Sequence, residues 1–195
     1  LDIAKDILYC ESKTSTRRLQ VQTVLNELAF TLMRLLNPII PFTMDEVNQN
    51  YPLKSKENVM YYEYPKVSHD FDENILKEYK EIKALRDEVL KALEESRTSG
   101  LIGSAQDAEI EITLLNENIK NIVNKYSKEE LIRLFIVSDV TIINGQNVEN
   151  KVASVKVSRH DGIKCDRCRN YYHEDEITEV EGTHLCSRCL KAIEK

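Results

Sequence analysis

The residues with the clearest chemistry are four cysteines near the end of the chain, arranged as two Cys-x-x-Cys pairs. Cys165 and Cys168 form the first pair, and Cys186 and Cys189 form the second after 17 intervening residues. Two thiolates three residues apart on a tight turn can bind one ion, and two such turns complete a tetrahedron with Zn–S distances of about 2.3 Å. A closed site of this kind stabilises structure and leaves no position for a reacting water. We therefore expect one structural Zn2+ held by these four cysteines.

Three alternatives to this site involve the same residue types. The cysteines could form disulfides, but the cytosol keeps thiols reduced and the paired spacing suits a metal better. His173 or His184 could replace a cysteine as a ligand, although four cysteines already complete the set. Cys10 lies on a predicted helix without an obvious partner, so we interpret it as a semi-buried thiol and not as a nucleophile or a fifth ligand.

The segment that carries the cysteines is too small to fold around an apolar core alone. It has about thirty residues and few large aliphatic side chains, so metal ligation has to replace that core. Val152, Val155 and Val157 predict a strand that leads into it. We expect residues 151–195 to form a zinc-finger tail that unfolds when zinc is removed.

The middle of the chain predicts a small α/β module over residues 66–150. Asp72 to Ser99 is predicted to be one amphipathic helix, with Asp72 as its cap and Gly100 as its terminator. Its apolar stripe comprises Ile75, Tyr79, Ile82, Leu85, Val89 and Leu93. Apolar and polar residues alternate with period two over residues 108–114, as in a half-buried strand. Ser127 to Glu130 is a capping-box pattern that opens a short helix, and residues 134–137 and 140–143 predict further strand.

The first part of the chain, residues 1–65, predicts helices. Apolar residues recur at helical spacing from Leu19 to Leu36, on enough of the circumference to predict a helix buried inside a bundle. Asn37-Pro38 should end it, because proline removes a backbone donor and restricts the residue before it. Thr43 to Glu46 resembles a capping box that starts the next helix. The expected fold class is therefore α+β with three modules: a partial helical bundle, the α/β module and the zinc finger.

Composition and charge limit the kinds of partner that we expect for this chain. The chain has 195 residues and a net charge of −6, which is unusual for a protein that contacts phosphates. Basic residues nevertheless cluster near both ends, and a nucleic-acid surface is expected there. We find no run of about 18 apolar residues and no signal-peptide pattern, so we expect a cytoplasmic protein without a membrane partner. Because the chain starts without Met inside an apolar-periodic run, we interpret it as an excised fragment.

Several motifs in order along the chain resemble one family. The run Leu35-Leu36-Asn37-Pro38-Ile39-Ile40-Pro41-Phe42-Thr43-Met44-Asp45-Glu46-Val47 resembles the end of the anticodon-binding helical domain in class I synthetases for isoleucine, valine and leucine. Residues 92–97 with 100–104, and residues 137–140, are similar to the segment that follows in bacterial isoleucyl-tRNA synthetases. Residues 162–168 with 185–189 resemble their C-terminal zinc finger. The resemblance covers nearly the whole chain.

The resemblance implies that this portion holds the anticodon arm of tRNA(Ile), within a monomeric enzyme that joins isoleucine to its tRNA by using ATP. Anticodon loops expose unpaired bases that proteins read by stacking and hydrogen bonds, with Lys and Arg neutralising phosphates. By type and position, the candidate RNA-binding residues are Lys13, Arg17, Arg18, Lys164, Arg167, Arg169, Tyr171, Tyr172 and Arg188. Each could instead be an ordinary solvated or packed side chain, and the arginines near the cysteines could offset thiolate charge.

The sequence departs from the family pattern at informative places. Bacterial members commonly carry Trp where this chain has Arg169 and Asn48, so a stacking role for Trp cannot be transferred. The His-Ile-Gly-His and Lys-Met-Ser-Lys-Ser signatures of the catalytic domain are absent. We therefore expect no catalytic residue here and no activity of this portion alone. ATP and Mg2+ would belong to the catalytic domain, and the rest of the synthetase chain would be a partner.

Two other classes of protein remain as alternatives. A DNA glycosylase of the formamidopyrimidine type has a zinc finger of similar spacing, but its Pro-Glu amino terminus is absent and the helical part is unlike it. A zinc-stapled interaction module such as a RING needs about eight ligands, whereas this chain offers four good ones.

Overall fold

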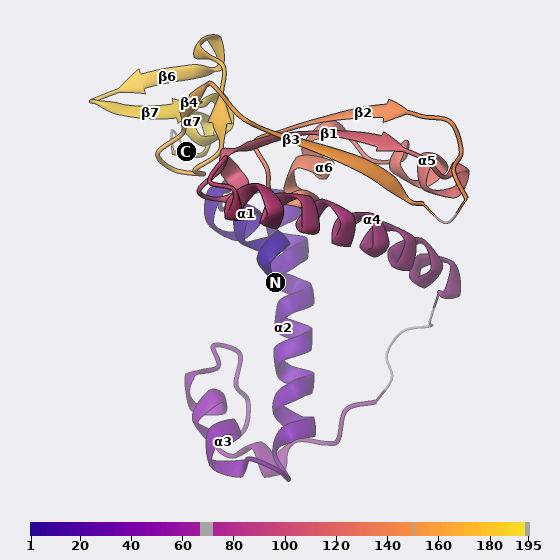
Figure 1. Cartoon of the computed structure of the whole chain (residues 1–195). Coiled ribbons are helices and arrows are strands. Elements are labelled where there is room, and N and C mark those ends of the chain that lie inside the picture. Colours follow the sequence, from indigo (N-terminus) through magenta and orange to yellow (C-terminus); the bar gives the residue numbers. More distant parts are fainter. Residues whose placement is uncertain (67–71, 150, 194–195) are drawn as a thin grey trace. The chain divides into compact units, whose positions relative to one another are not determined.

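The computed structural model describes residues 1–66, 72–149 and 151–193, and the described chain falls into two compact units (Figure 1). One unit combines Leu1–Lys13 with Asp72–Lys195, and the other is Thr14–Phe71. The mixture of helices and small sheets confirms the α+β class. The division into three modules at residues 65/66 and 150/151 stays a prediction. Among the described residues, no helix has both the length and the apolar character needed to cross a membrane.

The unit Thr14–Phe71 consists of helix α2 (Thr16–Leu36), helix α3 (Pro41–Asn50) and a 3-10 turn, η1 (Val59–Tyr61). Helix α2 begins at a Ser15 cap, whose hydroxyl accepts a hydrogen bond from the Arg18 amide at 3.4 Å. It ends at Leu36, immediately before Asn37-Pro38, as the sequence predicts. A small core of Met33, Met44 and Val59 joins the three elements.

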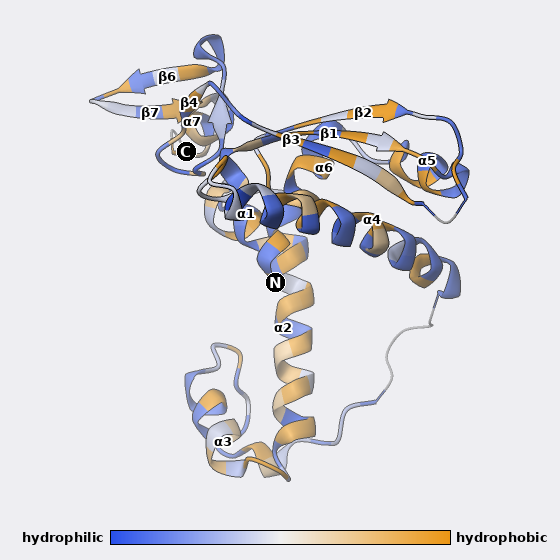
Figure 2. Cartoon of the chain, viewed as in Figure 1, coloured by the Kyte–Doolittle hydropathy of each residue, from blue (hydrophilic) through white to orange (hydrophobic). Residues whose placement is uncertain are grey.

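Two expectations for this unit are wrong. The apolar side chains of α2 are not buried in a bundle by the described residues, because only Met33 of this helix is buried and Val24 remains 57% exposed. Figure 2 shows hydrophobic residues along most of its length. Helix α3 begins at Pro41 and not at Thr43, since proline at the first helical position already has the required φ and lacks only an amide that the helix leaves unpaired.

The second unit contains a three-stranded sheet in the order β2-β1-β3. Strand β1 (Ala108–Leu114) pairs in parallel with β2 (Asp139–Asn144) and antiparallel with β3 (Ala153–Arg159). Ile110 lies opposite Val140 on one side and Val157 on the other. The strand predicted over residues 108–114 is therefore confirmed.

Three helices supply the remaining core of this sheet. They are α4 (Glu73–Thr98), α5 (Glu117–Val123) and α6 (Lys128–Phe135), and they join the alternate side chains of β1 in one apolar cluster. Alternate residues of β1 are buried because a strand directs successive side chains to opposite faces. The caps predicted at Asp72 and Ser127 are both present, and Gly100 follows α4 with a positive φ.

Some details of this unit differ from the sequence expectation. Residues 134–137 were expected to be strand, but Leu134 and Phe135 end α6, and Ile136 caps it with φ 60°. A short apolar run is compatible with either structure, and the fully buried Phe135 ring lies in the core as part of the helix. The stripe of α4 is buried only from Ile82 onward, because Ile75 and Tyr79 are exposed. Helix α5 was not predicted.

The last part of this unit is built from short elements. These are β4 (Ile163–Lys164), β5 (Tyr171–Tyr172), η3 (Glu174–Glu176), β6 (Ile177–Val180), β7 (Thr183–Cys186) and α7 (Ser187–Ile193). Strand β4 pairs with β5, and β6 pairs with β7. The N-terminal helix α1 (Asp2–Cys10) belongs to the same compact unit. Residues from both ends of the chain therefore meet around the cysteines.

Candidate metal centre

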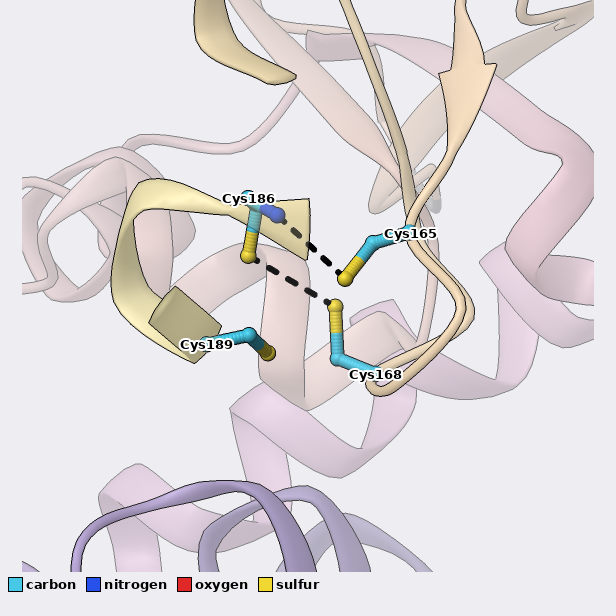
Figure 3. Close-up of side chains that lie close together, drawn as sticks. All are labelled: Cys165, Cys168, Cys186 and Cys189. Carbon is cyan, nitrogen blue, oxygen red and sulfur yellow. Dashed lines mark hydrogen bonds between the residues drawn. The ribbon is translucent and has the colours of Figure 1, made fainter. Parts of the chain in front are cut away.

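The four paired cysteines form one buried cluster. The sulfur atoms of Cys165, Cys168, Cys186 and Cys189 all lie within 4.8 Å of one another, and each residue is at most 5% exposed. In Figure 3 the four side chains, from two separate turns, surround one small space. The fold thus brings together the four cysteines that the sequence spacing predicts to be metal ligands.

The first pair of cysteines lies on a tight turn that follows β4. The Cys165 carbonyl accepts a hydrogen bond from the Arg169 amide at 2.9 Å, and the Asn170 carbonyl accepts one from the Cys165 amide at 2.9 Å. Arg169 takes a left-handed conformation with φ 71°, which L residues adopt rarely. This reversal allows Cys165 and Cys168 to present both sulfur atoms on the same side of the turn.

The second pair lies where β7 passes into α7. Cys186 ends the strand, and Cys189 lies in the first turn of the helix. The Cys186 amide donates to the sulfur of Cys165 at 3.4 Å, and this hydrogen bond joins the two turns. Gly162 immediately precedes β4, and no larger residue fits there, because a Cβ would lie 2.1 Å from the Tyr172 carbonyl oxygen.

The donor set fits a structural zinc ion. All five cysteines of the chain are free thiols, and the sulfurs of Cys168 and Cys186 are 3.9 Å apart, well beyond a disulfide bond of about 2.05 Å. Neither His173 nor His184 belongs to the cluster: the His173 ring packs near His160, and His184 lies beside Asp166. Four buried thiols, with no carboxylate of the described residues among them, suit one closed Zn2+ site.

The mutual repulsion of ionised thiols favours the binding of a cation between the four sulfur atoms. The hydrogen bond to Cys186 raises the pKa of Cys168 to about 11, and the corresponding bonds from Cys168 and Cys189 lower the pKa of Cys186. Ionisation of one sulfur thus opposes ionisation of its neighbours, because like charges repel. A divalent cation would offset this repulsion, so that all four sulfurs could act as thiolate ligands.

Two of the arginines expected to bind RNA are engaged inside the protein. Arg188, between Cys186 and Cys189, donates two hydrogen bonds to the Asp6 carboxylate at 2.5 and 2.6 Å. Burial disfavours the charged guanidinium, but the bond to Asp6 and its charge outweigh that effect and raise the pKa of Arg188. Arg167 donates to the carbonyl oxygens of Tyr9, at 3.2 Å, and of Cys10.

The other expected RNA-binding residues near the cluster have mixed surroundings. Arg169 is exposed. The Lys164 ammonium lies 5.3 Å from the centre of the Tyr171 ring and 3.9 Å from the Asp107 carboxylate. The Tyr172 hydroxyl lies 3.6 Å from the sulfur of Cys168, and burial raises the pKa of this tyrosine. Tyr172 therefore packs against the cluster.

The remaining candidates are not part of the cluster. Lys13 is exposed at the end of the segment Leu1–Lys13. Arg17 and Arg18 are half-buried in the first turn of α2, in the other unit. The unit that holds the cysteines thus also holds Lys164, Arg167, Arg169, Tyr171, Tyr172 and Arg188, whereas Arg17 and Arg18 belong to the other unit.

Polar residues that the sequence did not indicate join the cysteine turns to the sheet. The Gln106 amide nitrogen donates to the Cys168 carbonyl at 3.1 Å and to the Asn170 side-chain oxygen at 3.0 Å. The Ser138 hydroxyl donates to the Gln106 carbonyl and accepts from the Tyr171 amide. These partners are far apart in sequence, and no spacing rule connects them.

Comparisons with known proteins agree with this geometry. Residues 1–112 match the family described as the anticodon-binding domain of tRNA ligase. Residues 162–192 match the family described as a zinc finger found in FPG and IleRS, and this range includes all four clustered cysteines.

Three curated relatives align with nearly the whole chain. The isoleucine-tRNA ligase of Fervidobacterium nodosum is 40% identical over 192 residues, which cover 97% of this chain and 21% of the relative. The ligase of Kosmotoga olearia is 36% identical, with 100% and 22% covered, and isoleucine-tRNA ligase 1 of Oceanobacillus iheyensis is 36% identical, with 100% and 21% covered. The chain thus spans about a fifth of the length of these relatives. Because the first family model matches more than half of its residues, the chain belongs to the anticodon-binding domain family of tRNA ligases.

Proposed function

We propose that this chain is the tRNA-binding portion of an isoleucine-tRNA ligase and that it holds the anticodon arm of tRNA(Ile). The observation that carries the proposal is the combination, on one chain, of the anticodon-binding family match and the four-cysteine cluster. The relatives that align with both parts are named isoleucine-tRNA ligases.

The parent enzyme would join isoleucine to its tRNA at the expense of ATP. ATP and Mg2+ would bind in its catalytic part, and the remainder of that chain would be the main protein partner. We further propose that the parent works as a monomer in the cytoplasm. This portion contributes binding only, and we assign it no catalytic residue.

The role of zinc in this proposal is structural. Cys165, Cys168, Cys186 and Cys189 would hold one Zn2+ as four thiolates, and the ion would replace a hydrophobic core for the finger. The zinc-bound finger would then hold its side chains in a rigid arrangement for contact with RNA.

The distribution of those side chains selects the best RNA contacts among the residues proposed from sequence. Arg169 is exposed, and Lys164 and Tyr171 form a cation–π pair beside the cluster, so these three can meet a phosphate or an unpaired base. Arg167 and Arg188 already bind α1 and are weaker candidates. Lys13, Arg17 and Arg18 remain candidates near the start of the chain.

A glycosylase of the formamidopyrimidine type is the second candidate, because the finger family is described as found in FPG as well. The anticodon-binding match over residues 1–112 supports the ligase.

Equilibrium binding tests the proposal. The zinc-loaded chain would be titrated into a fluorescent tRNA(Ile) transcript and into the same transcript with a replaced anticodon loop, at several salt concentrations. We expect about tenfold weaker binding to the altered loop, because each stacked base contributes about 1–3 kcal/mol, and affinity should fall with salt. Equal affinity for both transcripts would contradict the proposal.

A further inference from the structure

Helix α1 makes its tertiary contacts with two parts of the same unit. One is helix α6, and the other is the pair of cysteine turns, which bind α1 through Arg167 and Arg188.

The contacts with the cysteine turns are polar and specific. The Arg188 guanidinium binds the Asp6 carboxylate through two parallel hydrogen bonds, the strongest geometry for such a pair. The Arg167 guanidinium binds the carbonyl oxygens of Tyr9 and Cys10, which are among the last carbonyls of α1 and lack partners within the helix. A cation at a helix C-terminus also interacts favourably with the helix dipole.

A contact of the buried Cys10 thiol completes this surface. Cys10 is 6% exposed and belongs to the same buried cluster as the four paired cysteines, and its sulfur lies 3.9 Å from the Arg167 carbonyl oxygen. The last turn of α1 thus packs directly on the first Cys-x-x-Cys turn.

Both arginines occupy positions that the metal ligands fix. Arg167 lies between Cys165 and Cys168, and Arg188 lies between Cys186 and Cys189. Among the described residues, the apolar side chains at the cysteines are few: Leu185 is buried, and Tyr172, Ile177 and Leu190 are partly buried. With so small a core, the conformation of these turns depends on the four thiolates being joined through one ion.

We propose that the two Cys-x-x-Cys turns form a zinc-dependent clamp for α1, in which Arg167 and Arg188 are positioning residues. Metal binding near the C-terminus is thereby linked to the docking of the N-terminal helix, over 157 to 182 positions of sequence. Because the linkage is reciprocal, releasing α1 weakens zinc binding by the same factor as removing zinc weakens docking.

Hydrogen exchange with mass spectrometry tests the clamp in the full chain, with zinc bound and after chelation. Without zinc, peptides covering α1 should lose protection together with residues 162–193, while the core strand β1 stays protected. Retained protection of α1 in the metal-free chain would overturn the proposal, since contacts with α6 would then suffice.

A variant separates the clamp from general unfolding of the finger. Asp6→Ala removes the partner of Arg188 but no cysteine, and Asp2→Ala removes an exposed carboxylate of the same helix as a matched control. In the zinc-loaded chain, Asp6→Ala should speed exchange in α1 by about tenfold and lower zinc affinity in a chelator competition by a similar factor. Asp2→Ala should leave zinc affinity unchanged. Unaltered exchange and zinc affinity in Asp6→Ala would also overturn the proposal.

Discussion

At the scale of single residues, position relative to the cysteines decides what each arginine does. Arg167 and Arg188 lie inside the Cys-x-x-Cys turns and bind α1, whereas Arg169 follows the first turn and is exposed. All three are candidates for RNA contact by residue type, and their positions in the sequence predict the larger effect on RNA binding for Arg169 and the larger effect on zinc binding for Arg167 and Arg188. The structure distinguishes them because the turn directs successive side chains toward different surroundings.

Asn48 is a second residue whose role follows from its contacts. It is fully buried in α3, where its amide donates to the carbonyls of Lys56 and Glu57 and its oxygen accepts from the Tyr62 hydroxyl. Buried polar groups are stable when they are satisfied in this way. Asn48 therefore acts in this chain as a packed, hydrogen-bonded amide of the small core around α3.

The first residue-level prediction concerns the metal. Cys168→Ser should bind less than one zinc per chain and lose the folded finger, because a hydroxyl is a poor replacement for a thiolate ligand. Zinc content by elemental analysis and hydrogen exchange of residues 162–193 would measure both effects. Cys10→Ser is the matched control, since this thiol is buried but lies outside the four-sulfur cluster. It should retain one zinc; equal zinc loss in the two variants would contradict the ligand assignment.

The second residue-level prediction concerns RNA. Arg169→Ala should weaken tRNA(Ile) binding and reduce the slope of log affinity against log salt by about 1, while zinc remains bound. The measurement is a salt-dependent binding titration paired with a zinc assay. Arg169→Lys retains the charge and should preserve the slope. If Arg169→Ala leaves affinity and slope unchanged, the finger has only a structural role.

At the scale of elements, the sequence predicts those whose pattern is local and regular. Apolar and polar residues alternate strictly along β1, and α4 has a cap at Asp72 and a terminator at Gly100. The predicted ends of these two elements therefore agree with the observed ends to within one residue. The run Leu134–Val137 fits a helix end as well as a strand, and only packing of Phe135 in the core decides between them. Helix α5 has seven residues, too few for a periodic signal.

The cap of α6 provides an element-level prediction. The Ser127 hydroxyl accepts a hydrogen bond from the Glu130 amide, and the Glu130 carboxylate accepts one from the Ser127 amide. Ser127→Ala should lower the free energy of unfolding by about 1 kcal/mol, because it leaves a helix amide without its acceptor. Urea denaturation of the zinc-loaded chain measures this change. Ser127→Asp keeps an acceptor at the cap and should cost much less; an equal loss in both variants would exclude the cap as the cause.

At the scale of the whole molecule, the limits of prediction are set by sequence distance. The clustering of the four cysteines could be predicted because each pair is local and the two pairs follow a known spacing. The bond between Asp6 and Arg188 joins residues 182 positions apart, and Gln106 reaches Cys168 across 62. Such contacts depend on how the sheet and the finger pack in three dimensions. The sequence therefore predicted the metal centre but not what surrounds it.

The distribution of charge along the chain bears on how a negatively charged protein could bind RNA. Although the chain carries −6, its acidic excess lies in the middle of the sequence, and the basic residues that we propose as RNA contacts lie nearer its two ends. We expect phosphates to be attracted locally by these Lys and Arg side chains, although the net charge of the whole chain opposes RNA binding.

A nuclease footprint of zinc-loaded chain on tRNA(Ile) tests the central claim most directly. The tRNA would be end-labelled, bound at saturating protein and digested lightly, so that each position reports its own protection. We predict protection of the anticodon stem and loop and unchanged cleavage of the acceptor stem, because this portion is proposed to hold the anticodon arm. Protection confined to the acceptor stem, or no localised protection at saturation, would contradict that assignment.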